Sequence, residues 1–374
     1  MNELRRKIER EIQDRGPIPF SRYMELCLYD PEFGYYSRNA AQFGKAGDFY
    51  TSSDVHAVFG RLLARQFDEM WRVLGSPSRI MIRELGPGRG LFAQDVMDWS
   101  EKKFPAFFSA LRYELIEQSP PLRERISQTL SRRLQSGKVT FGAVGKPATA
   151  DVPTIVFANE FFDAIPVEIL SPRGSLRVDC RDERLLEAWT SASSEEMAFL
   201  DRYSVHPEED ERVEASLLAK AAMSDACNFD CGFLLVIDYG YTRDELLAGR
   251  HRGTLKAIRQ HSVSANPYEA PGEQDITADV NFTALAAAAQ KRGFEVQKLL
   301  TQSQFLMGIG ESNQFADAFE NCRLPQERAK VALQLKHLVT PAGMGESFDV
   351  LLASKRIDTE KVFTMAGLSF GRRR

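Results

Sequence analysis

RIMIRELGPGRG (residues 79–90) joins a short apolar run to a turn in which every second residue is glycine. The run 79–85 predicts a buried strand, and the apolar residues after Gly90 predict a helix. Glycines at positions 86, 88 and 90 let the backbone turn sharply and approach a ligand, because no Cβ stands in the way. The free amides and the dipole at the start of the helix favour polar or anionic groups at this turn. We therefore expect a strand, a ligand-binding turn and a helix, in this order.

The spacing of these glycines excludes two common phosphate-binding turns. A dinucleotide-binding turn has the pattern G-x-G-x-x-G, whereas this turn is G-x-G-x-G and continues with Leu91. A mononucleotide P-loop needs Gly-Lys followed by Ser or Thr, which this stretch lacks. A tight strand-to-helix turn without a ligand is the simpler alternative for the glycines taken alone.

Apolar runs that alternate with helical segments predict the rest of the sheet. Near-continuous apolar strands indicate a parallel sheet that is buried on both faces. Right-handed crossovers then give a doubly wound α/β layer. The further strands that we expect are 113–117, 138–141, 154–160, 231–238, 294–299 and 348–354.

Acidic and amide residues stand where two of these strands end. Glu117 closes the second strand, where a carboxylate can accept both hydroxyls of a ribose; a solvated loop acid is the alternative. The fourth strand ends in ANEFFDAIPV (158–167). There Glu160 could orient a guanidinium through paired hydrogen bonds. The alternative is a capping network in which Asp163 or Asn159 bonds loop amides.

Composition excludes several classes of protein. A length of 374 residues suggests two or three domains, or one large domain with insertions. No apolar run is long enough for a transmembrane helix. A net charge of −4 gives no strong field for binding nucleic acid non-specifically. The five cysteines are too sparse for a disulfide scaffold, and Cys227 and Cys231 have no His or second Cys pair beside them, so we expect no metal site.

The pattern E-x-G-x-G-x-G, followed by an acid at the end of the next strand, resembles the class I S-adenosylmethionine-dependent methyltransferases. Six motifs in a fixed order resemble more closely the MidA-like family, which contains the mitochondrial complex I assembly arginine methyltransferase. They cover nearly the whole chain from the region of Gly16. The motifs are GDFYTSSD (47–54), ELGPGRG (84–90), ELIEQSPPLRERI (114–126), ANEFFDAIPV (158–167), LLVIDYGY (234–241) and PGEQDITADVNF (271–282).

This resemblance implies an α/β fold: a Rossmann-like class I methyltransferase sheet with helical and β-hairpin insertions. It implies an N-terminal helical lid segment over 1–75 and a methyltransferase core over 76–374, with insertions around 166–230 and 242–345. The implied activity is methylation of protein arginine to symmetric dimethylarginine, with S-adenosyl-L-methionine as cofactor. Two alternatives stay open, which are an assembly factor that binds the cofactor without turnover and a small-molecule methyltransferase.

The resemblance also implies roles for individual residues. Glu117 should hold the ribose of the cofactor, and Asn159 and Glu160 should face its methyl group. The residues implied to contact the cofactor are Gly47, Asp48, Thr51, Ser52, Glu84, Gly86, Pro87, Gly88, Gly90, Glu117, Gln118, Ser119 and Asn159, of which the first four should form a lid. The candidate catalytic residues are Glu160, Asn159, Asp163, Asp238 and His261, with Tyr239 on the substrate side.

Two places depart from the family pattern. Asp54 and His56 stand where a Glu and a Ser are expected, and Asp279 and Asn281 stand where a His and an Asp are usual. The second departure removes a candidate proton carrier, which keeps the assembly factor without turnover among the alternatives.

The expected partner is a protein substrate, with a respiratory complex I subunit as one candidate, and a second copy of the chain is another candidate partner. Neither nucleic acid nor a membrane span is expected. Residues 1–15 alternate charges and carry no apolar core of a secretory signal. We therefore expect the cytoplasm in a bacterium, or the mitochondrial matrix in a eukaryote.

Overall fold

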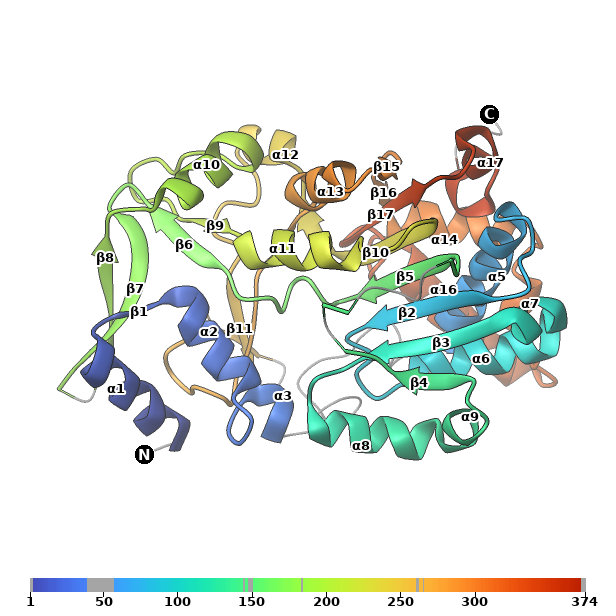
Figure 1. Ribbon diagram of the computed structural model, residues 1–374, viewed down its shortest axis with the longest axis horizontal. Helices are drawn as coiled ribbons and strands as arrows, with labels where there is room; N and C mark the ends of the chain where they lie inside the picture. The colour runs from blue at the N-terminus through green and yellow to red at the C-terminus, as the bar shows by residue number, and fades with distance from the viewer. Residues whose placement is uncertain are drawn as a thin grey trace.

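The computed structural model describes residues 3–38, 57–143, 145–146, 151–182, 184–259, 262–264 and 266–370 (Figure 1). Its N-terminal part comprises α1 (Glu3–Arg15), β1 (Ile18–Pro19), α2 (Phe20–Tyr29), α3 (Tyr35–Arg38) and α5 (Ala57–Val73). The next part comprises β2 (Ile80–Leu85), α6 (Leu91–Lys103), α7 (Pro105–Ala110), β3 (Leu111–Ile116), α8 (Pro120–Thr129), α9 (Ser131–Gln135), β4 (Val139–Phe141) and β5 (Thr154–Asn159).

Three further groups of elements complete the chain. The first holds β6 (Glu168–Ser171), β7 (Gly174–Arg181), β8 (Arg184–Thr190), α10 (Ser194–Tyr203), β9 (Val213–Ala215) and α11 (Leu217–Ala226). The second holds β10 (Gly232–Tyr241), α12 (Arg243–Leu247), β11 (Lys256–Arg259), β12 (Ser262–Ser264), β13 (Asp275–Thr277), β14 (Val280–Asn281) and α13 (Phe282–Lys291). The third holds β15 (Glu295–Val296), β16 (Leu300–Thr301), α14 (Gln302–Glu311), α15 (Ala316–Phe319), α16 (Pro325–Val339), β17 (Phe348–Lys355), α17 (Thr359–Phe363) and the 3-10 turn η1 (Ala366–Leu368).

A large mixed sheet forms the core, with strand order β15-β17-β10-β5-β2-β3-β4. The strands from β10 to β4 are parallel to their neighbours, whereas β17 is antiparallel to β10. The α/β fold expected from the sequence is confirmed. Of the strand expected at 294–299, only β15 at 295–296 is formed, and a second short strand, β16, follows at 300–301; both pair with β17.

The order of the strands reverses between β2 and β5. After β2 the chain moves outward to β3 and β4, and it then returns to β5 on the other side of β2. In open α/β sheets a crevice at the carboxyl ends of the strands marks this reversal. In Figure 1 the carboxyl ends of β2 and β3 point toward the half of the molecule that holds α2, α3 and β11.

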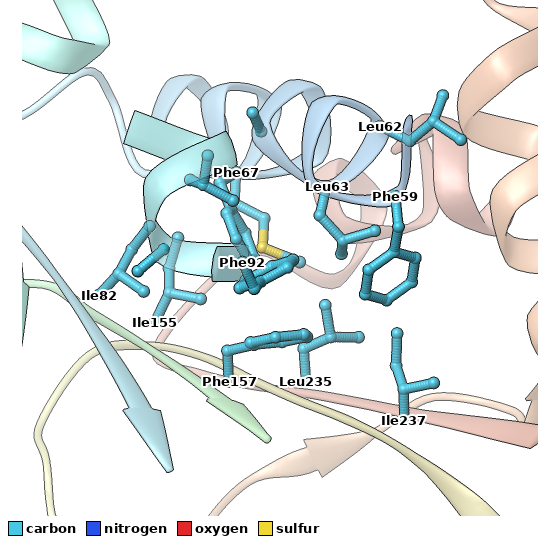
Figure 2. Close-up of a cluster of buried hydrophobic side chains, with 14 of the residues drawn as sticks. Phe59, Leu62, Leu63, Phe67, Ile82, Phe92, Ile155, Phe157, Leu235 and Ile237 are labelled. Atoms are coloured by element: carbon cyan, nitrogen blue, oxygen red, sulfur yellow. The ribbon is translucent and has the colours of Figure 1, made fainter. Parts of the chain in front are cut away.

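Alternate side chains of β5 enter two separate cores, because successive residues of a strand point to opposite faces. Ile155 and Phe157 pack in a cluster with the helices α5 and α6 (Figure 2). Val156 and Ala158 pack in a second cluster that includes residues of α11 and α13. The sheet is therefore covered on both faces, as the near-continuous apolar runs indicate.

A second, smaller sheet lies beside the carboxyl ends of the large one, with order β1-β7-β6-β9 and with β8 paired to β7. Leu4, Ile8 and Ile12 on one face of α1 are buried in the core that this sheet shares with α2. The hairpin between β6 and β7 requires glycine at position 174, which has a φ of +108°. A Cβ there would lie 2.0 Å from the carbonyl oxygen of Thr190.

Within the described ranges, no helix has the length and apolar character to cross a membrane. In the same part of the chain, no three His, Cys, Asp or Glu side chains gather in a way that could hold a metal ion. The five cysteines are free thiols, and Cys27 and Cys227 are buried.

Phe92 of α6 stacks on Phe157 of β5, with ring centroids 4.5 Å apart (Figure 2). We predict that Phe92→Ala lowers the free energy of unfolding by about 3–5 kcal/mol, because it leaves a cavity in the core. Phe370→Ala, at a side chain that is 41% exposed, should change it by less than about 1 kcal/mol. Urea unfolding followed by circular dichroism measures both, and equal losses would contradict the assignment of this core.

Candidate functional site

With respect to the described residues, the turn between β2 and α6 has open space beside only one of its three glycines. Gly86, Gly88 and Gly90 have φ values of +62°, +54° and +75°, a region that glycine adopts with little strain. A Cβ at Gly86 would lie 2.8 Å from the ring of Phe161, and one at Gly90 would lie 3.3 Å from Leu130. A Cβ at Gly88 would have no neighbour within 4 Å among the described residues. Among the described residues, the turn therefore leaves open space beside Gly88.

Glu84 lies at the end of β2 and is only 5% exposed. The hydroxyl of Tyr113 on β3 donates a hydrogen bond of 2.9 Å to its Oε2. Burial raises the pKa of Glu84 to about 8, and this hydrogen bond opposes the shift only in part. The carboxyl group is therefore mainly neutral at pH 7.

Glu117 directly follows β3, in the short loop before α8. Its Oε1 accepts a 2.8 Å hydrogen bond from the backbone N–H of Ser119, and burial raises its pKa. The hydroxyl of Ser119 caps α8 by accepting from the N–H of Leu122 at 3.5 Å, while Gln118 beside it is exposed. Glu117 is thus a partly buried acid held by its own loop.

The chain turns sharply at Glu160, directly after β5. Glu160 has a φ of +50°, which costs free energy in any residue other than glycine. Its N–H donates to the carbonyl oxygen of Ile237 at 3.0 Å, and its Oε1 accepts from Nδ2 of Asn159 at 3.0 Å. The amide and the carboxylate at the strand tip are therefore oriented together.

The carboxylate of Asp238 holds this turn in place. Its Oδ2 accepts from the N–H groups of Phe161, Phe162 and Asp163, at 3.2, 2.9 and 3.4 Å. Its Oδ1 accepts from the N–H of Tyr239 at 2.9 Å. Asp238 is fully buried, and burial together with the charge of Asp163 raises its pKa. The capping network considered from the sequence exists, but Asp238 forms it.

Asp163 connects the core to the strand β13. Its Oδ2 accepts a 3.0 Å hydrogen bond from the hydroxyl of Thr277, and its carbonyl oxygen accepts from the N–H of Ala278 at 3.0 Å. Its Oδ1 is buried and has no hydrogen-bond partner among the described residues. Burial raises the pKa of Asp163 to about 6, and the negative charge of Asp279 contributes.

Tyr239 packs against Phe348 of β17, with ring centroids 3.8 Å apart. Burial raises the pKa of its hydroxyl, and the charge of Glu160 is the next largest cause. The phenol therefore lies near the tip of β5.

The two positions that depart from the family pattern have structural partners. Asn281 caps α13, where its Oδ1 accepts from the N–H of Ala284 at 2.9 Å. Asp279 faces Lys256 at 3.1 Å and His251 at 3.4 Å. The remaining expected residues, Gly47, Asp48, Thr51, Ser52, Asp54, His56 and His261, lie outside the described residues.

Sequence reasoning missed four residues beside the site: Tyr29, Tyr36, Asp275 and Thr277. Thr277 bonds Asp163, and Tyr36 bonds Asp275. Tyr36 lies in the aromatic stretch DPEFGYYS (30–37), and Asp275 and Thr277 lie in the motif at 271–282, so these two stretches are the sequence signals for three of the residues. Tyr29 lies outside both stretches.

Comparison with known proteins shows the family of the chain. Residues 62–300 match a family model for S-adenosyl-L-methionine-dependent methyltransferases. The chain belongs to this family, the MidA-like family that the six motifs resemble. S-adenosyl-L-methionine is therefore its cofactor, as expected from the sequence.

Similar proteins come from animals and bacteria. The chain is 31% identical to a Drosophila melanogaster protein named Protein arginine methyltransferase NDUFAF7 homolog, mitochondrial, over 93% of this chain and 84% of that protein. It is 27% identical to the Homo sapiens protein named Protein arginine methyltransferase NDUFAF7, mitochondrial, over 93% and 82%. A crystal structure of a COG1565 superfamily member from Burkholderia thailandensis, bound to S-adenosyl-homocysteine, has 28% identity and a TM-score of 0.80. The match covers 95% of this chain and 92% of that one.

The raised pKa of Glu84 predicts how stability depends on pH. A carboxyl group with a raised pKa in the folded state stabilises the fold below about pH 4.5, its unfolded value, and this stability is lost as pH rises toward about 8. Gln resembles the neutral acid. We therefore expect Glu84→Gln to raise the Tm relative to wild type, with a difference that grows from pH 5 to pH 8.

Differential scanning calorimetry at several pH values measures this difference. Glu195→Gln, at an exposed residue in the first turn of α10, is the control and should give a difference that changes little with pH. A Glu84→Gln difference that shrinks as pH rises would show that Glu84 is ionised in the folded protein.

Proposed function

We propose that this methyltransferase acts on arginine side chains of a protein. The observation that carries the proposal is the group of carboxylates at the tip of β5. Burial and the charge of Asp279 raise the pKa of Asp163, and burial and the charge of Asp163 raise that of Asp238. A bound cation would stabilise their ionised forms, because an opposite charge lowers the pKa of a carboxyl group.

The guanidinium of arginine suits this site better than the ammonium of lysine does. Glu160 is held at the strand tip by Asn159, so its carboxylate is oriented before a substrate arrives. Arginine presents a planar fork of N–H groups that matches a carboxylate through two hydrogen bonds. The names of the similar animal proteins, which are protein arginine methyltransferases, support the same substrate class.

The residues at the sheet edge fit the cofactor. Gly88 borders open space, and Asn159 carries a buried Oδ1 without a hydrogen-bond partner among the described residues. We propose that Glu117 binds the ribose and that the turn with Glu84 binds the amino-acid end. The full proposed set is Glu84, Gly86, Pro87, Gly88, Gly90, Glu117, Gln118, Ser119 and Asn159, with Gly47, Asp48, Thr51 and Ser52 as candidates for a cover.

The chemistry divides between the cofactor and the chain. S-adenosyl-L-methionine supplies a methyl group that its sulfonium already activates. Glu160 binds and orients the guanidinium, which leaves one nitrogen in line for transfer. Asp163 is the candidate acceptor of the proton that the nitrogen loses, because a pKa of about 6 makes it mostly ionised at neutral pH. Asp238 does not contact substrate in this proposal and instead holds the turn.

The proposal includes a product and a target protein. The MidA-like resemblance favours symmetric dimethylarginine, and a respiratory complex I subunit is the first target to test. The relatives named above are mitochondrial proteins, which makes the matrix the corresponding location in a eukaryote. Pairing of two copies of the chain is a separate proposal that sedimentation would test.

The decisive experiment follows a labelled methyl group from the cofactor into cell-lysate protein. We predict labelled protein that yields dimethylarginine after digestion. Glu160→Gln should lower the rate by about 100-fold or more, while calorimetry shows S-adenosyl-homocysteine binding within about twofold of wild type, because Glu160 faces the acceptor. The control Glu195→Gln should match wild type in both measurements.

The outcomes separate the alternatives. Cofactor binding without transfer to protein, in wild type and variant alike, would contradict arginine methylation and favour the assembly factor. Label found only in small molecules would favour the small-molecule methyltransferase instead.

Gly88 and Gly137 allow a matched test of the cofactor site. Both have a positive φ, +54° and +69°, and a Cβ at either would meet no described atom within 4 Å. Alanine therefore costs a similar strain of about 1–2 kcal/mol at each position. We predict that only Gly88→Ala weakens S-adenosyl-homocysteine binding, by about tenfold or more, because its methyl group enters the ligand space. Equal affinity of the two variants in calorimetry would place the cofactor elsewhere.

A further inference from the structure

The aromatic stretch DPEFGYYS (30–37) forms the turn between α2 and α3 and the first residues of α3. Oδ1 of Asp30 accepts from the N–H groups of Glu32 and Phe33, at 3.1 and 3.0 Å, and Lys7 pairs with the same carboxylate. The turn also packs closely on the chain near β13, since a Cβ at Gly272 would lie 2.3 Å from the carbonyl oxygen of Phe33. This turn therefore fixes where the tyrosines of α3 lie.

Tyr36 of α3 bridges two segments that are distant in sequence. Its hydroxyl donates a 2.9 Å hydrogen bond to Oδ1 of Asp275. Its backbone carbonyl oxygen accepts a 3.1 Å hydrogen bond from the hydroxyl of Ser119. One residue thus contacts both the start of α8 and the start of β13.

The two partners of Tyr36 lie beside the two parts of the proposed site, the cofactor side at Glu117 and the acceptor side at Asp163. Ser119 donates its N–H to Glu117, the proposed ribose ligand. Asp275 begins β13, and Thr277 at the end of the same strand donates to Asp163. Hydrogen bonds through Tyr36 therefore connect the loop of Glu117 to β13, which bonds Asp163.

Tyr29 supports the same connection from α2. Its hydroxyl donates a 2.9 Å hydrogen bond to the carbonyl oxygen of Ala164, and its ring lies 5.5 Å from that of Tyr36. After burial, the charges of Asp275, Asp163 and Glu117 are the causes that raise its pKa, so its hydroxyl lies among the carboxylates of both halves. Tyr29 as a whole is 42% exposed, so part of the residue borders solvent while its hydroxyl is bonded to the loop after β5.

We propose that Tyr36, with Tyr29 beside it, is a positioning residue of the methyl-transfer site. It connects the loop that takes the ribose to the turn 160–163, so that cofactor binding stiffens the turn that receives the substrate. Ordering one loop restricts the other because α3 is bonded to the first loop through Ser119 and to β13 through Asp275, and β13 in turn is bonded to Asp163 through Thr277. The inference rests on the proposed function only for the place of the cofactor, not for the identity of the acceptor.

Hydrogen exchange of the intact protein with and without S-adenosyl-homocysteine tests this coupling. In wild type we expect the ligand to slow exchange at the amides of Phe161, Phe162 and Asp163 by about fivefold or more. In Tyr36→Phe this slowing should be mostly lost, while affinity for the ligand falls by only about three- to tenfold, the effect of one hydrogen bond. Tyr29→Phe should also lose most of the ligand-dependent slowing of exchange. This variant tests the proposal if Tyr36→Phe does not fold.

Tyr23→Phe is the matched control, because Tyr23 also lies on α2 and its hydroxyl donates to a loop carbonyl, that of Pro267, at 2.7 Å. Removing a hydroxyl that has only a structural role lowers the Tm but leaves the ligand-dependent slowing of hydrogen exchange intact. We expect this result for Tyr23→Phe. If Tyr36→Phe and Tyr29→Phe behave as Tyr23→Phe does, or if wild type shows no slowing at the turn, the proposal is overturned. The readout needs no arginine acceptor, so failure of arginine methylation would leave its result unaffected.

Discussion

The buried carboxylate of Asp238 is the contact on which the site depends. It accepts hydrogen bonds from the N–H groups of Phe161, Phe162, Asp163 and Tyr239. A buried carboxylate is costly unless it is hydrogen-bonded, and the amides of a sharp turn are costly when unpaired, so each satisfies the other. The same contact offsets the strain of the residue before the turn, which has a positive φ. Strand β10 thereby sets the shape of the loop that follows its neighbour β5.

The sheet topology brings the separate chemical groups together. Because β2, β3 and β5 are parallel, the residues after them meet at one edge, and the reversal of strand order opens that edge to a ligand. The smaller sheet and α2–α3 lie against the same edge (Figure 1). The site therefore has a rigid side, built on a core such as that in Figure 2, and a side made of turns joined by single hydrogen bonds. A cofactor that contacts both sides can restrict the motion of the turns far more than that of the rigid sheet side.

Several features of the fold and the site followed from local pattern. The apolar run at 79–85 predicted β2, the alternating glycines predicted the turn, and the apolar stretch at 154–160 predicted β5. These predictions succeeded because burial on both faces of a parallel strand leaves a continuous apolar run in the sequence. The direction of β17 did not follow, and neither did the shortening of the expected strand at 294–299 to β15, with β16 after it. An apolar run looks the same in either direction, and pairing depends on the neighbouring strand.

The sequence by itself determined which chemical groups stand at the strand ends, because a strand and the residue that follows it are contiguous in the chain. Glu117 and Glu160 could be named as candidates for this reason. Only the tertiary structure decided what each group bonds. Asp238 caps a turn 75–77 residues away in sequence, and Tyr36 bonds partners 83 and 239 residues away. Such contacts leave no periodicity in the sequence, because they arise only when the folded layers bring distant loops to the same edge of the sheet.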